Sequence, residues 1–214
     1  MEADNGLRLL MDTGSTADRL LWNAEALGID LASLNGVFIS HWHGDHYGGL
    51  SGLLKRYGGG LKVFVPRKPS LTLGREVSRL GAELVEAKRA IELLPGFYST
   101  GDLGGEHALV IALEDIGLVV LTGCSHPGPE RMVEAAVENT GERPYALIGG
   151  LHISSYGRGA ELGRFLNRAG LKLVCPCHCT GLRAREGLRA SFTGAFVQCG
   201  AGRRMDIGRA DGGA

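Results

Sequence analysis

Short apolar runs alternate along the chain with longer segments in which apolar residues recur at helical spacing. The run 37–40 is apolar almost throughout, which is typical of a buried strand, whereas 18–27 carries leucine and alanine at helical spacing and is followed by Gly28, a common helix stop. The same reasoning predicts strands at 8–12, 37–40, 62–65, 83–86, 109–113, 118–122, 145–148 and 171–175, and a last strand or strand pair at 196–207. It predicts helices at 18–27, 48–57, 73–80, 129–138, 160–169 and 183–191.

The order of these elements predicts an α/β fold. Strands and helices alternate, but the apolar runs 109–113 and 118–122 flank a Glu-Asp-Ile-Gly turn, which is a hairpin signal. Hairpins among alternating elements favour mixed sheets over purely parallel ones. With no fixed-period repeat and no linker, the sequence predicts a single domain over 1–214 with two packed sheets and outer helices.

Composition narrows the class of protein. Hydrophobic residues make up 44% and charged residues 21% of the 214 positions, as in ordinary globular proteins. Because 23 basic residues balance 23 acidic ones, we expect a small-molecule substrate and no nucleic-acid partner. No apolar run is long enough to span a bilayer, so no membrane association is expected. The acidic start is unlike a signal peptide. We therefore expect the five cysteines to be reduced thiols or metal ligands in the cytoplasm, and not a disulfide framework. The oligomeric state is left open.

The strongest chemical signal is a cluster of ligand-type residues directly after the strand 37–40. His41 and His43, two positions apart, can chelate one ion, while the adjacent Asp45 and His46 can reach a second. Imidazole and carboxylate ligands suit catalytic zinc, or iron or manganese in the same geometry. The alternative is a set of solvated loop histidines, but the presence of four ligand-type residues within six positions disfavours it. We therefore predict two divalent metal ions, with zinc favoured over iron or manganese.

The motif His-x-His-x-Asp-His, with Asp-Thr-Gly at 12–14 before it and Gly-Gly-Leu at 48–50 after it, resembles the metallo-β-lactamase superfamily. The segments 122–128, 148–152 and 178–181 resemble the branch of 7,8-dihydropterin-6-methyl-4-(β-D-ribofuranosyl)-aminobenzene-5′-phosphate synthases and related metallohydrolases. The match runs in order over nearly the whole chain. It implies an αββα sandwich of two mixed sheets with outer helices. Family members usually carry one or two strands before the Asp-Thr-Gly turn, so we expect the N-terminal strands to be shortened.

The resemblance also implies the remaining ligands. His126 would join His41 and His43 on the first metal, and His178 would join Asp45 and His46 on the second. The alternatives are a position beside a helix N-terminus for His126 and a satisfied core histidine for His178. Asp12 would anchor the metal loop through hydrogen bonds.

Three further positions stay open between chemistry and packing. Cys124 occupies the position of the bridging aspartate in many superfamily members, and it is either a ligand or a buried inert thiol. His152 could be a ligand, a proton donor or a substrate contact. His107 is expected at the surface. If strand geometry holds, the sulfurs of Cys175, Cys177 and Cys179 face away from His178, and we interpret them as small buried residues and not as a separate zinc site.

The predicted function is a dinuclear-metal-dependent hydrolase of an ester-like bond, phosphoester or carboxyl-derived. A metal-bridging hydroxide would attack, oriented by Asp45, and His152 would stabilise the developing charge or protonate the leaving group. The alternative is a transferase that joins a dihydropterin pyrophosphate to ribofuranosylaminobenzene 5′-phosphate. A second alternative is a metal-binding family member without catalysis. Hydrolysis of β-lactam antibiotics and RNA processing are both disfavoured.

Overall fold

The structure is a computed structural model that describes residues 1–208. Its helices are α1 (Ala17–Ala26), α2 (Gly44–Tyr47), α3 (Leu50–Tyr57), α4 (Leu71–Arg79), α5 (Pro129–Thr140), α6 (Tyr156–Ala169) and α7 (Leu182–Ser191), with a 3-10 turn at Leu31–Ser33. Its strands are β1 (Leu9–Met11), β2 (Gly36–Phe38), β3 (Lys62–Val65), β4 (Glu83–Glu86), β5 (Ile91–Leu94), β6 (Phe97–Ser99), β7 (Leu109–Leu113), β8 (Gly117–Thr122), β9 (Pro144–Gly150), β10 (Leu173–Cys177) and β11 (Ala195–Phe196).

Local sequence sets the ends of several helices. The hydroxyls of Thr16, Ser70 and Ser155 accept hydrogen bonds from backbone N–H groups in the first turns of α1, α4 and α6. Gly141 and Gly170 end α5 and α6 in the left-handed conformation, which glycine adopts without steric cost.

The strands form two sheets. The first has the order β1-β2-β3-β4 with parallel pairing throughout, and the second has the order β11-β10-β9-β8-β7-β6-β5. In the second sheet β8 to β11 pair in parallel, whereas β5 to β8 pair antiparallel, so this sheet is mixed as predicted. The first sheet is purely parallel, whereas a mixed sheet was predicted. Its consecutive strands are connected by helices and not by hairpins, and such crossover connections join parallel strands.

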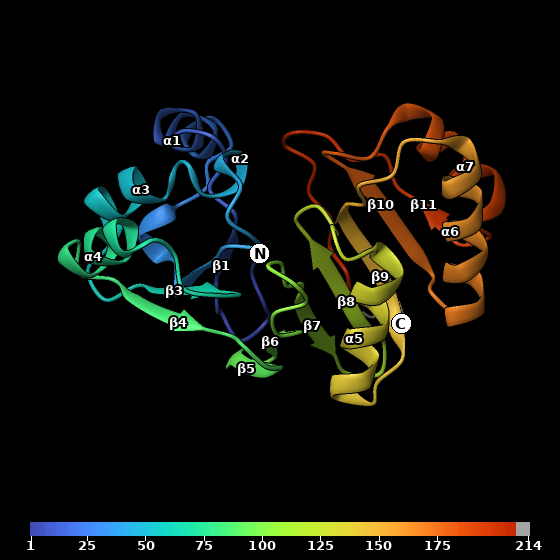
Figure 1. The fold of residues 1–214 in the computed structure, drawn as a ribbon, viewed down its shortest axis with the longest axis horizontal. Coiled ribbons are helices and arrows are strands. Elements are labelled where there is room, and N and C mark those ends of the chain that lie inside the picture. The colour runs from blue at the N-terminus through green and yellow to red at the C-terminus, as the bar shows by residue number, and fades with distance from the viewer. Residues whose placement is uncertain (209–214) are drawn as a thin grey trace, which may run out of the picture.

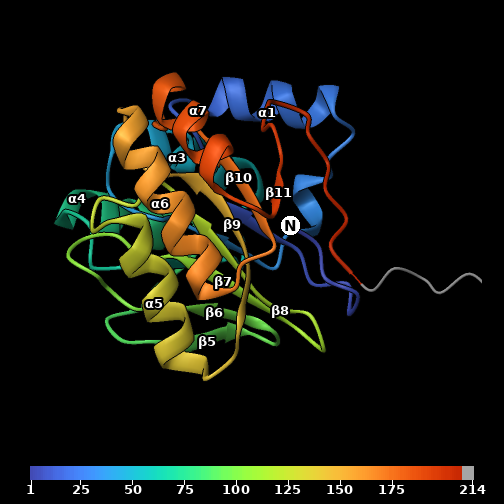
Figure 2. The same cartoon turned by 90° about the vertical axis from the view of Figure 1, so that its right-hand side faces the viewer.

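The sheets pack face to face with helices outside them. Figure 1 shows α1 to α4 with the first sheet in one half of the molecule, and α5 to α7 with the second sheet in the other. Turned by 90°, α5, α6 and α7 lie across the second sheet (Figure 2). In β2 and the residue after it, Val37 and Ile39 face the helices while Phe38 joins Phe64 and Phe97 between the sheets. Strands buried on both faces explain why their sequence is apolar almost throughout.

The predicted αββα architecture is confirmed, with differences in detail. The strands β5 and β6 were not predicted, because Pro95-Gly96 interrupts a stretch without clear alternation. The prediction of strand structure over 196–207 is wrong beyond β11, which ends at Phe196. The first described strand pairing near the N-terminus is an isolated bridge between Glu2 and Arg8, followed by β1. The single-domain organisation stays a prediction, and its last six residues lie outside the described part.

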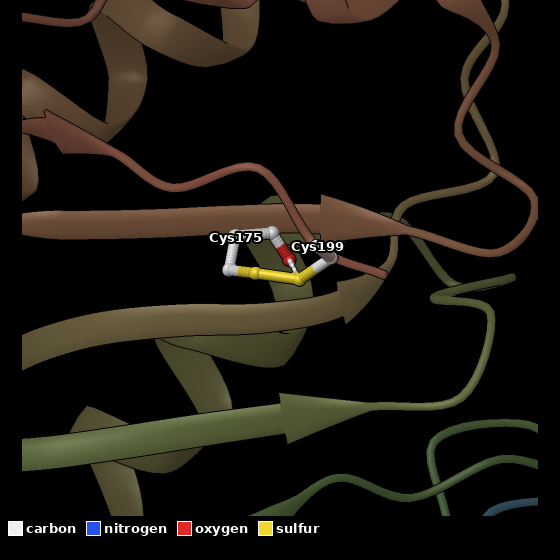
Figure 3. The surroundings of a disulfide bond; sticks show 2 residues. All are labelled: Cys175 and Cys199. Carbon is white, nitrogen blue, oxygen red and sulfur yellow. Dashed lines mark hydrogen bonds between the residues drawn. A yellow bond between two sulfur atoms is a disulfide. The ribbon is translucent and has the colours of Figure 1, made fainter. Parts of the chain in front are cut away.

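Cys175 and Cys199 form a disulfide, with their Cα atoms 5.8 Å apart (Figure 3). The expectation that the cysteines form no disulfide is therefore wrong for this pair. The backbone N–H of Val197 donates to the carbonyl of Val174, so the chain returns beside β10 twenty-four residues after Cys175. Sequence spacing does not encode that return. Cys124, Cys177 and Cys179 are free.

Within residues 1–208, we find no helix that is both long and apolar enough to cross a bilayer.

Candidate metal centre

The predicted ligands come from loops that follow four strands. The segment after β2 carries His41, His43, Asp45 and His46, and the loops after β8, β9 and β10 carry His126, His152 and His178. Because β8, β9 and β10 pair in parallel, their carboxyl ends meet at one edge of the second sheet. In α/β sheets, ligands commonly bind beside the carboxyl ends of the strands. The structure therefore brings the six predicted metal ligands and His152 into one cluster.

The first group of donors is His41, His43 and His126, whose ligand atoms lie within 4.8 Å of one another. The Nε2 atom of His41 lies 3.0 Å from Nδ1 of His43. Two nitrogens on a tetrahedral zinc ion, each about 2.0–2.1 Å from the metal, are about 3.3 Å apart. These two nitrogens thus converge closely enough to fit one ion of that kind.

Glu106 orients His126, a role that sequence analysis missed. Its carboxylate is buried and lies 2.7 Å from Nδ1 of His126, which leaves Nε2 for the first donor group. The backbone N–H groups of Cys124, Ser125 and His126 donate to the same carboxylate at 2.7 to 2.9 Å. Burial alone would raise the pKa of Glu106, but these hydrogen bonds outweigh it and hold the pKa below its usual range. A buried carboxylate behind a histidine is the usual support of a metal ligand.

The second group of donors is Asp45, His46 and His178. The Nε2 atoms of the two histidines lie 3.1 Å apart, and Oδ2 of Asp45 lies 3.2 Å from Nε2 of His178 and 3.5 Å from Nε2 of His46. Burial would raise the pKa of Asp45, yet its backbone hydrogen bond and the histidines lower it, so the group is a carboxylate near neutral pH. Two nitrogens and a carboxylate oxygen fit a divalent ion in the zinc class.

Asp12 anchors the metal loop, as the family resemblance implied. Its carboxylate accepts hydrogen bonds from the backbone N–H and the hydroxyl of Ser40, both at 2.8 Å, and lies 2.7 Å from Nδ1 of His46. Burial would lower the pKa of His46, but the hydrogen bond and the charge of Asp12 outweigh it and raise the pKa. Burial, followed by the charge of His46, lowers the pKa of His41 to about 3. Asp12 thus fixes Nδ1 of His46 and turns Nε2 towards the second donor group.

Cys124 lies between the two donor groups. Its Sγ atom is 3.4 Å from Nε2 of His46, and it groups with His41 and His46 within 4.8 Å. A hydrogen bond with Cys179, and then burial, raise the pKa of the Cys124 thiol. The same hydrogen bond lowers the pKa of Cys179 to about 5.

His152 lies at the edge of the donor cluster, where the sequence analysis expected it. Its side chain is exposed, its ring centroid lies 4.6 Å from that of His126, and its ligand atom groups with those of Cys124 and His126. Its role as a metal ligand, a proton donor or a substrate contact stays a prediction.

Left-handed backbone collects around the cluster. Of the five non-glycine residues with positive φ among residues 1–208, four belong to the site and its supports: Asp12, Ser125, His152 and His178. Such conformations cost of order 1–3 kcal/mol each and persist where surrounding structure holds them, often at functional sites. The turn at His178 ends the strand alternation after β10. Consequently the predicted separation of sulfurs from His178 fails for Cys179, whose sulfur groups with His178 and Cys124.

The prediction that His107 lies at the surface is wrong. Its side chain is fully buried, stacks on Phe38 at 3.9 Å between ring centroids, and donates from Nε2 to the carbonyl of Ile39. Its Nδ1 accepts from the hydroxyl of Ser99 at 2.8 Å. The position beside Glu106 in an expected turn suggested exposure, but β7 begins two residues later, and the chain already lies between the sheets at His107. Burial lowers its pKa to about 3.

Exposure divides the cluster into a buried floor and an open side. His41 and His46 are buried, whereas His43, Asp45, His126, His152 and His178 are exposed. Ligand sets of catalytic metals keep a position open for water or substrate. The arrangement therefore suits a reaction at a surface site, and metal binding by these residues stays a prediction.

Fold and donor set together define an αββα sandwich with histidine and carboxylate donors at one sheet edge. The sequence-family model of the metallo-β-lactamase superfamily matches residues 2–152, which is more than half of the chain. The chain therefore belongs to the metallo-β-lactamase superfamily.

Several known proteins are similar over most of the chain. The 7,8-dihydropterin-6-methyl-4-(β-D-ribofuranosyl)-aminobenzene-5′-phosphate synthase of Methanocaldococcus jannaschii is 27% identical, covering 93% of this chain and 85% of that protein. The crystal structure of Tm1679, a metal-dependent hydrolase of the β-lactamase superfamily, has a TM-score of 0.77 and 30% identity, covering 94% of this chain and 89% of that one. YhfI from Bacillus subtilis, at 15% identity and a TM-score of 0.60, covers 95% of this chain and 93% of that one, and shares the fold alone.

Proposed function

We propose that the protein is a dinuclear-metal-dependent hydrolase that acts on an ester-like bond, phosphoester or carboxyl-derived, in a small molecule. One observation carries the proposal: the two donor groups adjoin. His41 of the first group and His46 of the second have ring centroids 4.1 Å apart, and their ligand atoms belong to one cluster with Cys124. Ions held by the two groups would be neighbours, as in two-metal hydrolytic sites.

The donor chemistry supports the assignment of ligands. His41, His43 and His126 would hold one divalent ion, and Asp45, His46 and His178 the other, with zinc proposed first and iron or manganese as alternatives. Asp12 and Glu106 support one histidine of each group at 2.7 Å. When bound, such ions lower the pKa of a coordinated water and polarise the bond under attack.

Two residues of the chain would act on the reacting atoms. Asp45 is an exposed carboxylate whose Oδ2 atom faces both histidines of its group, so it can orient a nucleophilic water on the open side. His152 is exposed beside His126, where its imidazole can donate a proton to a leaving group. Both assignments are proposals.

A transferase reaction is the second candidate, favoured by the similarity over 93% of the chain to the archaeal synthase. In that reaction a dihydropterin pyrophosphate would lose pyrophosphate and accept ribofuranosylaminobenzene 5′-phosphate. The same ligand set would serve, because both reactions expel an oxygen-linked leaving group. The similarity to Tm1679, at 30% identity and over 94% of the chain, favours hydrolysis.

The deciding experiment combines metal analysis with an activity screen. Purified protein is analysed for bound metals and tested with generic phosphodiester, phosphomonoester and lactone substrates, and with the pterin pyrophosphate plus its aryl acceptor. The hydrolase proposal predicts two metals per chain and turnover of one generic class, reduced at least about 100-fold in Asp45→Ala but unchanged in Glu138→Gln, an exposed carboxylate on α5. Turnover only with both pterin and acceptor would replace hydrolysis by the transferase reaction.

A further inference from the structure

Among the described residues, Cys124 belongs to three of the five possible ligand groups, more than any other residue. Its sulfur groups within 4.8 Å with His41 and His46, which belong to different donor groups. It also groups with His126 and His152 on one side, and with His178 and Cys179 on the other. The sulfur thus lies within 4.8 Å of donor atoms from both proposed metal positions.

The backbone holds this sulfur in place. The N–H of Cys124 donates to Oε1 of Glu106 at 2.8 Å, and the buried residue lies two positions after the end of β8. Its neighbour Gly123 packs against Ser40 and the His41 ring so closely that a Cβ there would lie 3.2 Å from Nδ1 of His41. The missing side chain at Gly123 lets the end of β8 approach the metal loop.

We propose that the thiolate of Cys124 is a ligand shared by both metal ions. This inference rests on the proposed dinuclear site and names one more ligand of it. On binding, the thiol proton leaves to solvent and the sulfur forms one bond to each ion. Because a coordinating thiol is deprotonated by the ion itself, the raised pKa of the metal-free thiol does not prevent this.

A shared thiolate would set the choice of metal. Thiolate ligands select soft or borderline ions, whereas carboxylate and water ligands suit manganese and magnesium. The site is therefore expected to bind zinc and cobalt at least about 100-fold more tightly than manganese. Replacing the sulfur by oxygen, as in Cys124→Asp, is expected to narrow that ratio.

The competing arrangement is a thiol pair. Cys179 lies beside Cys124, with its sulfur 3.6 Å from the Cys124 carbonyl oxygen. An oxidised Cys124–Cys179 pair would leave no thiolate for the metals. Thiol counting after unfolding without reductant separates the two: the proposal predicts that three thiols react, Cys124, Cys177 and Cys179, and a count of one would overturn it.

The test measures metal–sulfur bonds directly and does not depend on activity. X-ray absorption on the zinc-loaded protein is expected to show a Zn–S distance of about 2.3 Å with about one sulfur per zinc, since each ion contacts the shared atom. A value of about one sulfur per two zinc ions would place the thiolate on a single ion and contradict sharing. In the cobalt-loaded protein, a sulfur-to-cobalt charge-transfer band should appear in the near ultraviolet.

Matched variants assign the sulfur. Cys124→Ser and Cys124→Asp are expected to lose the band, with the aspartate variant retaining two cobalt ions, while Cys179→Ser and the half-buried Cys177→Ser keep it. A band that survives in Cys124→Asp and vanishes in Cys179→Ser would transfer the role to Cys179. Two bound metals without any metal–sulfur signal would overturn the inference and leave the proposed function standing. A chain without bound metal would remove both.

Discussion

The Oε2 atom of Glu106 lies 2.7 Å from Nδ1 of His126, and three consecutive backbone N–H groups hold the same carboxylate. One buried side chain therefore fixes both the loop after β8 and the histidine that this loop presents. The proposed first metal position depends on a residue that belongs to none of the donor groups found among residues 1–208.

Replacing Glu106 by Gln should weaken zinc binding. The amide places an N–H group against backbone donors, so we expect the free energy of unfolding to fall by about 1–3 kcal/mol. Loss of the carboxylate behind His126 should lower zinc affinity about 10–100-fold. Competition with a chromophoric chelator measures the affinity, with Glu138→Gln as the exposed control. Unchanged affinity in a folded Glu106→Gln variant would show that His126 needs no such support.

His107 should make stability depend on pH. Its pKa is about 3 in the folded protein and near 6.5 when unfolded, so the unfolded chain takes up a proton first as the pH falls below about 6.5. Stability is therefore lost between about pH 6.5 and 3, by about 2 kcal/mol at pH 5. Urea unfolding with a chelator, compared between the wild type and His107→Gln, isolates this share from the metal ligands. Equal pH slopes in the two proteins would mean that His107 takes up its proton in the folded state.

Gly123 should not tolerate a methyl group. A Cβ there meets the Ser40 hydroxyl and the His41 ring, so Gly123→Ala should lower stability by about 1–3 kcal/mol and reduce metal content. The control is Gly157→Ala on α6, where a Cβ has open space; it should be neutral or stabilise by up to about 1 kcal/mol. Thermal unfolding and elemental analysis of both variants check this. Full metal content in Gly123→Ala would refute the close approach of β8 to the metal loop.

The disulfide should stabilise the C-terminal part of the chain. The disulfide closes a loop between Cys175 and Cys199, 24 residues apart, and so lowers the conformational entropy of the unfolded chain. This raises the free energy of unfolding by about 3 kcal/mol. In Cys199→Ser the free energy of unfolding, measured by urea unfolding, should fall by that amount. Reductant should lower the free energy of unfolding of the wild type to the same value. If reductant changes nothing and five thiols react in the unfolded wild type, the bond does not form.

Sequence patterns predicted what depends on local periodicity and on contiguous motifs. The buried run at β2, the helix stop at Gly28 and the donors at 41–46 all follow from neighbours in the chain. Residues whose roles depend on distant chain segments were not predicted from the sequence. Glu106 acts through a loop that begins at residue 123, and His107 is buried because the chain enters β7 between the sheets. The pairing of Cys175 with Cys199 belongs to the same class, since only the return of the chain beside β10 brings them together.

The central claim is that two adjacent donor groups hold two metal ions. Elemental analysis of the purified protein, repeated with His43→Ala from the first group and His178→Ala from the second, tests it most directly. We predict two divalent ions per chain in the wild type and about one in each variant, because each substitution removes a donor from only one group. A wild-type protein that folds with a single ion, or variants that both keep two, would contradict the dinuclear site.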